Sequence, residues 1–523
     1  MMVRKFSPNP TPDPSVTNEA LDAMAAEELR ALIRGIIPWL DESTHARLAN
    51  AIIDRAARNA SSWVPAVPTK EAVTEIVSFA EAAVRTGHAD PSDIDDYLRQ
   101  GSNAFLARDY PKAAQIFQAL LLPLADAEID LGQHELLDEV LAVDIAECAA
   151  QYAAAAYMNA TPMSRAEAVL AAIDAVGGVG HFWEPLRELE RVAIETLPSF
   201  QGFLADWHAL LEARVDKERR SDWDSDAARW RREAVQRLEG NEGLARVARS
   251  TKSADDLRAW CGALADAGDW KQALSAYDEA AELVRDGKHY CGEFLDGAAL
   301  AAQKLGRKDL PARLERAWRE APSMVRLRRW LGSAAGKNAL RAHATNALAA
   351  CPKQAGRQRG LLHVLLGDFA AATNLLARAP GLGWSGSEHP GHVLFPLFAS
   401  LLARTPLDVT STRDFEELRI MMSEADEPRL AIPEIATLIA LADVSVSETS
   451  REALLGAMRK AAEKRIAGVT ENKRRRHYGH AAGLALTCVR IDPNESAAWM
   501  TRIRSEYKRY PALQGELAEY GRR

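Results

Sequence analysis

Apolar residues recur with a helical period along nearly the whole chain. The segment 69–86 is a clear example, because its apolar residues are spaced by three, four and seven positions and so share one helix face. These residues are Val73, Ile76, Val77, Ala80 and Val84. Thr69 can cap the first turn and Gly87 can end the last one. Strand-like alternation bounded by hairpin turns is missing, so the predicted fold class is all-α.

A second pattern occurs three times, with a small or medium residue followed by defined residue types at offsets 3, 9, 12 and 16. The three copies are Gly101, Ala104, Tyr110, Ala113 and Phe117; Cys261, Leu264, Trp270, Ala273 and Tyr277; and Gly360, His363, Phe369, Ala372 and Leu376. The small residue lets two helices approach closely, the first aromatic fills the turn, and the alanine and last residue pack against the neighbouring helix. Gly268 and Gly367 add a turn glycine at offset 7 in the last two copies.

These three segments resemble tetratricopeptide repeats, a family of paired antiparallel helices that stack into solenoids. The copies begin 160 and 99 residues apart, and neither interval is a multiple of the family's period of about 34 residues. We therefore expect an irregular α-solenoid. The residues expected to hold the repeats together are Gly101, Tyr110, Ala113, Phe117, Trp270, Ala273, Tyr277, Gly360, Phe369 and Ala372.

Prolines, glycines and charge runs divide the chain into segments. The predicted organisation is a disordered lead (1–17), an N-terminal helical hairpin (18–66), helical repeats (69–215) with a tetratricopeptide-like unit at 98–125, a charged bridging helix (216–250), tetratricopeptide-like repeats (251–380), an irregular loop (381–396) and a C-terminal helical segment (397–523). Helical pairs joined by short loops are expected to be antiparallel.

Composition and charge narrow the function classes. Of the 523 residues 47% are hydrophobic and 26% charged, which is typical of a folded domain. The net charge of −8 disfavours nucleic-acid binding by the chain as a whole. A local basic run, Lys473, Arg474, Arg475 and Arg476, followed by Tyr478, keeps nucleic acid open as an alternative partner. Arg326, Arg328, Arg329 and Trp330 form a second basic cluster.

Residues with catalytic chemistry form no recognisable motif. The five cysteines are widely spread and contain no Cys-x-x-Cys pair, and no Gly-x-Ser-x-Gly elbow is present. We therefore expect no catalytic, metal-binding or cofactor-binding residues and no cofactor, although an enzyme whose site assembles only in space stays a further alternative. No apolar run approaches the roughly 20 residues of a membrane span, and a cytoplasmic location is expected.

The irregular loop 381–396 is the expected contact surface, because irregular loops on rigid scaffolds often carry function. Trp384, His389 and His392 are the predicted partner-contact residues. The stretch from Gly383 to Pro396 resembles a segment of uncharacterised bacterial helical-repeat proteins. The tail around Ile466, Lys473, Arg476, Tyr478, Ala481 and Leu484 is similar to the helical ends of bacterial SWIM-zinc-finger proteins, without their zinc motif.

Together these observations predict a non-enzymatic helical-repeat scaffold that binds a protein partner on a concave helical face. The nucleic-acid-associated accessory protein and the enzyme within a helical shell are the two alternatives.

Overall fold

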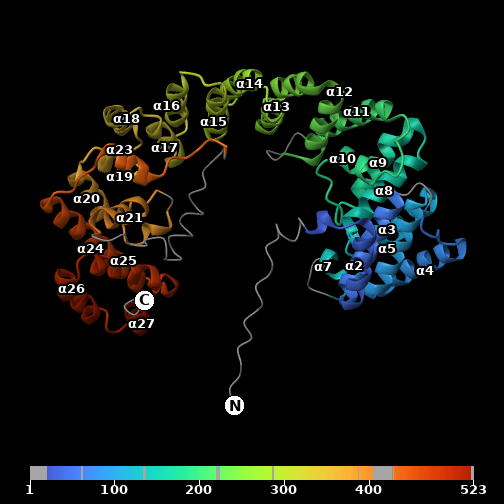
Figure 1. Cartoon of the computed structure of the whole chain (residues 1–523), viewed down its shortest axis with the longest axis horizontal. Helices are drawn as coiled ribbons and strands as arrows, with labels where there is room; N and C mark the ends of the chain where they lie inside the picture. The colour runs from blue at the N-terminus through green and yellow to red at the C-terminus, as the bar shows by residue number, and fades with distance from the viewer. Residues whose placement is uncertain are drawn as a thin grey trace, which may run out of the picture. The chain divides into compact units, whose positions relative to one another are not determined.

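The computed structural model describes residues 20–59, 63–132, 137–218, 224–285, 288–386, 388–403, 427 and 429–519. Regular secondary structure in these ranges is entirely helical (Figure 1). Within them, a single β-bridge joins His88 to Asp130. The predicted all-α class is confirmed: the fold is an irregular α-solenoid of antiparallel helical pairs. The chain forms two compact units, unit 1 (Met1–Leu244) and unit 2 (Ala245–Arg523). The predicted lead, 1–17, lies outside the described residues.

Helices of unit 1 pack mainly against the next helix in sequence or against the one after it. Its elements are α2 (Ala26–Ile36), η1 (Ile37–Trp39), α3 (Glu42–Asn59), α4 (Lys70–Thr86), α5 (Pro91–Leu106), α6 (Tyr110–Ala125), α7 (Leu137–Val140), α8 (Ile145–Asn159), η2 (Pro162–Ser164), α9 (Arg165–Ala175), α10 (Pro185–Val192), α11 (Phe200–Glu218) and the first part of α12 (Asp226–Thr251). Helices α4, α5, α6, α8 and α9 share one continuous apolar core. Thr69 caps α4 and Gly87 ends it in the left-handed conformation, as the sequence predicts.

Unit 2 is also built from helices that pack against the next helix in sequence. Its elements are α13 (Ala254–Asp266), α14 (Trp270–Leu283), α15 (Lys288–Lys304), α16 (Leu310–Glu320), α17 (Met324–Gly332), α18 (Lys337–Ala350), α19 (Gly356–Leu365), α20 (Phe369–Arg378), η3 (Gly383–Ser385), α21 (Gly391–Leu402), α23 (Ile435–Ala442), α24 (Glu448–Glu471), η4 (Arg475–His477), α25 (Tyr478–Ile491), α26 (Pro493–Glu506) and α27 (Pro511–Glu519). Helices α13 to α16 pack in sequence order, whereas α24 reaches back to pack against α20 and α21.

The three predicted repeat copies fold as the helical pairs α5–α6, α13–α14 and α19–α20, and each pair is closed by the same turn. An aspartate precedes the second helix of each pair. The three aspartates are Asp109, Asp269 and Asp368. Each donates its backbone N–H to a carbonyl five residues earlier and accepts, through its carboxylate, the N–H three residues later. The recurring pattern therefore encodes a helical pair with a defined C-cap and N-cap.

Most residues expected to hold the repeats together lie in the core. Nine of them are buried, namely Gly101, Tyr110, Ala113, Phe117, Ala273, Tyr277, Gly360, Phe369 and Ala372. A Cβ at Gly101 would lie 2.8 Å from the Phe117 ring, so the small residue does permit close helix approach. Trp270 differs because it is half-buried, and the Lys304 ammonium lies 5.9 Å from its ring centroid.

Two predicted segment boundaries differ from the observed helices. Helix α21 begins at Gly391, inside the stretch 381–396 that is expected to be loop. Helix α12 begins at Asp226 and bends at Gly240, where φ is 63°. It buries Trp230 and Val235, so this part of the predicted charged bridging helix contributes to the core. The sequence missed this burial because the arginines around Trp230 dominate the local pattern.

Candidate functional site

The predicted contact residues of the 381–396 segment lie inside unit 2. Trp384 is 5% exposed and His389 6%, and His392 is half-buried, so the expectation of an exposed loop is wrong for these side chains. The Trp384 ring centroid lies 4.6 Å from that of His389 and 4.9 Å from that of His480 in α25. The histidines that suggested a contact surface are packing partners of this tryptophan.

Hydrogen bonds hold the His389 ring in its neutral form. Its Nδ1 accepts the backbone N–H of Gly391 at 3.1 Å, and its Nε2 lies 3.1 Å from the carbonyl oxygen of Pro380 and donates to it. Burial lowers the pKa of His389 and of His392 to about 4. The pKa of His480 falls to about 3, mainly through burial and secondarily through the Arg465 guanidinium.

The basic run lies in the turn between α24 and α25. Lys473, Arg474, Arg475 and Arg476 are all exposed, as nucleic-acid binding would require. Tyr478 is buried, so its ring cannot stack on a base. The second basic cluster is also unsuited to nucleic acid, because Arg326 and Arg329 are buried and pair with Asp296 at 3.0 and 3.3 Å.

Unit 1 contains a groove of about 760 Å³ between α3 and the start of α8. One wall comes from α3, with Arg47, Asn50, Ala51, Asp54 and Arg58. The opposite side comes from residues 141–147 and from the loop at 178–181, and its apolar residues include Leu141, Val143, Ile145 and Val179. The groove is therefore partly apolar and has charged side chains along the α3 wall.

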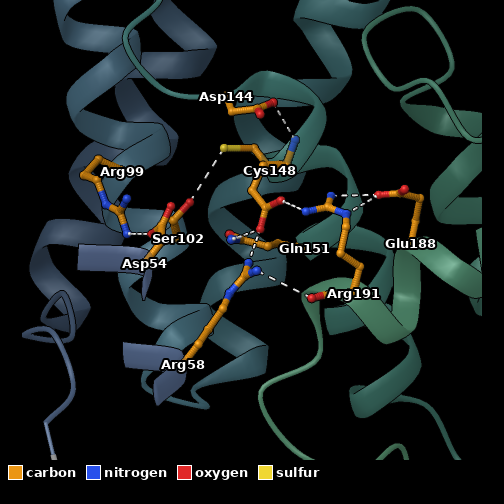
Figure 2. Close-up of polar contacts among 10 residues, drawn as sticks. Asp54, Arg58, Arg99, Ser102, Asp144, Cys148, Gln151, Glu188 and Arg191 are labelled. Carbon is orange, nitrogen blue, oxygen red and sulfur yellow. Dashed lines mark hydrogen bonds and ion pairs between the residues drawn. The ribbon is translucent and has the colours of Figure 1, made fainter. Parts of the chain in front are cut away.

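Helix α3 is fastened across this groove by polar contacts, whereas apolar packing contributes little. Ala57 is its one buried residue in the described chain. The Arg47 guanidinium donates to the carbonyl oxygens of Glu139 and Leu141 at 3.1 and 3.0 Å. Further along α3, Asp54 pairs with Arg99 of α5 at 2.8 Å (Figure 2). These contacts hold α3 beside the groove.

At the Arg58 position of the groove wall, two arginines share one carboxylate. Arg58 of α3 and Arg191 of α10 both pair with Glu147 of α8. Figure 2 labels the two arginines, together with Gln151 and Glu188. The Glu147 side chain is 12% exposed and also accepts the Gln151 amide at 3.2 Å. Arg191 additionally pairs with Glu188 at 2.7 Å. A charge-assisted network of this kind orients α3, α8 and α10 relative to one another.

The groove offers binding groups and no activated nucleophile among the described residues. The Cys148 thiol next to it has a pKa raised to about 12 by burial, and its sulfur lies 3.6 Å from the Ser102 hydroxyl. A thiol with that pKa stays protonated at neutral pH. The described residues also contain no group of three or more His, Cys, Asp or Glu side chains that could hold a metal ion.

Sequence reasoning did not find this groove. Arg58 and Glu147 are 89 positions apart, and Arg58 and Arg191 are 133 apart, so no local pattern joins them. One local signal was present: Asp144 caps α8 by accepting the N–H of Glu147 at 2.9 Å, which places Glu147 in the first helical turn. That signal locates the carboxylate along α8 but does not identify its partners.

Comparison with known proteins gives little further information. No family model matches the chain, and no curated protein matches it. One similar solved structure is described as a "circular tandem repeat protein with novel repeat topology and enhanced subunit contact surfaces". It is 15% identical, the alignment covers 91% of this chain and 95% of that chain, and the TM-score is 0.20. None of the described helices has the length and apolar character needed to cross a membrane.

Proposed function

We propose that the chain is a non-enzymatic helical-repeat scaffold that binds a protein partner, and that the groove between α3 and α8 receives an extended segment of that partner. The observation that carries the proposal is the groove itself. It combines an apolar floor, formed by Leu141, Val143, Ile145 and Val179, with a polar α3 wall whose side chains are held by ion pairs. Concave sites with a few fixed polar groups are the usual binding sites of proteins. Burial of Trp384 and His389 argues against the 381–396 segment as the contact surface.

The charges along the groove favour a partner segment of low net charge. Each carboxylate in the network already has a guanidinium: Asp54 pairs with Arg99, and Glu147 pairs with both Arg58 and Arg191. An apolar, weakly charged peptide therefore buries its side chains on the floor without separating an existing ion pair, which would be costly.

We also propose that the chain is related to tetratricopeptide-repeat proteins and that its C-terminal tail is similar to the helical ends of SWIM-zinc-finger proteins. The three helical pairs with the shared turn support a relationship to tetratricopeptide repeats. In the C-terminal tail that is similar to SWIM-zinc-finger-associated proteins, Ile466, Ala481 and Leu484 are buried, which supports a packing role for these residues.

Selection of a displayed library of random peptides on the full-length chain tests the groove. We expect enriched apolar sequences that bind the wild-type chain and lose at least tenfold in affinity on Ala51→Trp, because the indole fills the groove from the exposed α3 wall. Ala171→Trp is the matched control, since Ala171 is an exposed alanine of α9 outside the groove. Failure to enrich any sequence, or equal binding to Ala51→Trp, would exclude the groove.

The exposure of all four cations at 473–476 supports a second candidate, binding of a phosphate backbone. A fluorescent single-stranded DNA oligonucleotide should then bind at low salt, with an affinity that falls steeply as salt rises. Replacing Lys473, Arg474, Arg475 and Arg476 by serine should abolish binding, whereas Lys508→Ser with Arg509→Ser, a pair of exposed cations elsewhere in unit 2, should not. No binding at low salt would remove this candidate.

A further inference from the structure

The N-terminal helix α2 carries an apolar stripe that the described chain leaves in solvent. Leu29, Leu32, Ile33 and Ile36 follow the spacing i, i+3, i+4 and i+7 and so share one face. Leu32 and Ile33 are each 40% exposed and Ile36 is 38% exposed, and no residue of α2 is buried. Trp39 of the following η1 turn is 85% exposed. Such a stripe at anchor spacing is typical of helices that dock through one face.

The charges flanking the stripe are complementary to those of an identical helix. At about 100° per residue, Glu28 and Arg30 lie on opposite flanks of the stripe. When two copies pack stripe to stripe in parallel around a two-fold axis, the Glu28 flank of one copy meets the Arg30 flank of the other on both sides. An antiparallel pair would instead put Glu28 on the flank of Glu28 and Arg30 on the flank of Arg30.

Helix α2 is also locally neutral, although the whole chain has a net charge of −8. Glu27 and Glu28 are balanced by Arg30 and Arg34, so two α2 helices approach without net repulsion. From these observations we propose that α2 is a self-association surface, on which a second copy of this chain docks its own α2 in parallel through Leu29, Leu32, Ile33 and Ile36.

The association is expected to be weak, because an 11-residue helix buries far less than the roughly 1,200 Å² of a standard interface. Sedimentation equilibrium of the full-length chain over about 5 to 200 μM should show a monomer–dimer equilibrium with a dissociation constant within that concentration range. Ile33→Glu should weaken it at least tenfold, whereas Met163→Glu, a charge placed on a 92% exposed apolar residue outside α2, should leave it unchanged. A monomer at every concentration, or a dimer unaffected by Ile33→Glu, would overturn the proposal.

Disulfide cross-linking tests the parallel orientation. The five native cysteines are buried, so an introduced cysteine is the accessible thiol. Leu29→Cys and Ile36→Cys should each form a disulfide-linked homodimer on mild oxidation. If the two variants cross-link only when they are mixed, the pairing is antiparallel and the proposed arrangement is wrong.

Charge exchange gives an independent readout of the same geometry. Glu28→Arg or Arg30→Glu alone should weaken dimerisation several-fold, and the double exchange should restore it because the flanks are again complementary. Hydrogen exchange within α2 checks the helix in each variant, because Glu28 also accepts the backbone N–H of Ala25 at 2.8 Å and Arg30 pairs with Glu27. A double exchange that fails to restore dimerisation while the helix persists would overturn the flank pairing.

Neither result depends on the groove. The peptide selection uses Ala51→Trp on α3, whereas these experiments change α2 alone, so the partner-binding proposal and the self-association proposal can fail separately.

Discussion

The helix α3 of unit 1 and the segment 380–391 of unit 2 are both additions to a helical-repeat framework, but they are attached by opposite means. Helix α3 buries only Ala57 among its described residues and is held by ionic and backbone hydrogen bonds across a groove. The segment 380–391 buries Trp384 and His389 against α24 and α25 with backbones in close contact. Polar attachment leaves room for a ligand, whereas close packing leaves none, which is why we place partner binding at α3.

The largest expected effect is at Gly381, where the segment 380–391 meets α24. A Cβ at this position would lie 1.9 Å from the carbonyl oxygen of Lys464, which is backbone and cannot swing away. Gly381→Leu should therefore lower the free energy of unfolding of unit 2 by at least about 4 kcal/mol. Urea unfolding followed by circular dichroism measures this.

Gly456→Ala is the control for that substitution. Gly456 lies in α24 as well, but a Cβ there would meet nothing within 4 Å. The alanine should stabilise the helix by about 0.5–1 kcal/mol. Equal effects at Gly381 and Gly456 would show that the segment 380–391 is not closely packed.

The second largest expected effect is that acid destabilises the packing of the segment 380–391, whose buried histidines have lowered pKa values, more than the attachment of α3. Burial lowers the pKa of His389 and His392 to about 4 and that of His480 to about 3, against 6.5 for an ordinary histidine. Between pH 6.5 and the lowered pKa values, these histidines bind protons in the unfolded chain but not in the folded chain. Their contribution to the free energy of unfolding of unit 2 is therefore fully present above pH 6.5 and is lost as the pH falls toward 4. Since one unit of pKa shift corresponds to about 1.4 kcal/mol, we expect each of these histidines to account for a loss of up to about 3 kcal/mol near pH 4.5.

Hydrogen exchange, corrected for its intrinsic pH dependence, measures this loss in α21 and α25. Helices α8 and α9 of unit 1 provide the internal reference. His392→Gln should reduce the acid sensitivity, because glutamine can still donate to the carbonyl oxygen of Gly386, which lies 3.2 Å from the His392 Nε2, and does not titrate. An unchanged pH dependence in that variant would contradict the assignment.

The attachment of α3 should respond to charge. Glu147→Gln leaves Arg58 and Arg191 without their shared carboxylate, and we expect the docking of α3 to weaken by about 2 kcal/mol. Hydrogen exchange should accelerate in α3 while α9 and unit 2 stay protected. Glu188→Gln is the matched control, because Glu188 pairs with Arg191 at the more exposed rim and should have a smaller effect. Loss of protection throughout unit 1 would mean that Glu147 supports the core.

The repeat framework could be predicted from the sequence, and the groove could not. The offsets from Gly101 to Phe117 report contacts within one helical pair, which local spacing determines. By contrast, Arg58 meets Glu147 only after α3 docks on α8, and His480 meets Trp384 only after α25 packs on the segment 380–391. The glycines, prolines and histidines at 381–396 suggest a loop in solvent, yet here the glycines permit backbone contact and the histidines fill the core.

The smallest expected effect concerns the turn inside the helical pairs. This turn occurs in both units, but the residue at its left-handed position differs between them. Gly268 and Gly367 of unit 2 occupy the left-handed position of the turn with φ of 74° and 75°, whereas unit 1 places Arg108 there with φ of 66°. A residue with a Cβ is strained in this conformation, so Arg108→Gly should stabilise unit 1 by about 0.5–1 kcal/mol. The exposed pairing of Arg108 with Glu195 at 3.9 Å contributes little in opposition. A rise in the urea midpoint of unfolding measures this gain in stability. The reverse change in unit 2, Gly268→Ala, should lower the stability of that unit by a similar amount. Destabilisation by Arg108→Gly would show that the turns are not equivalent.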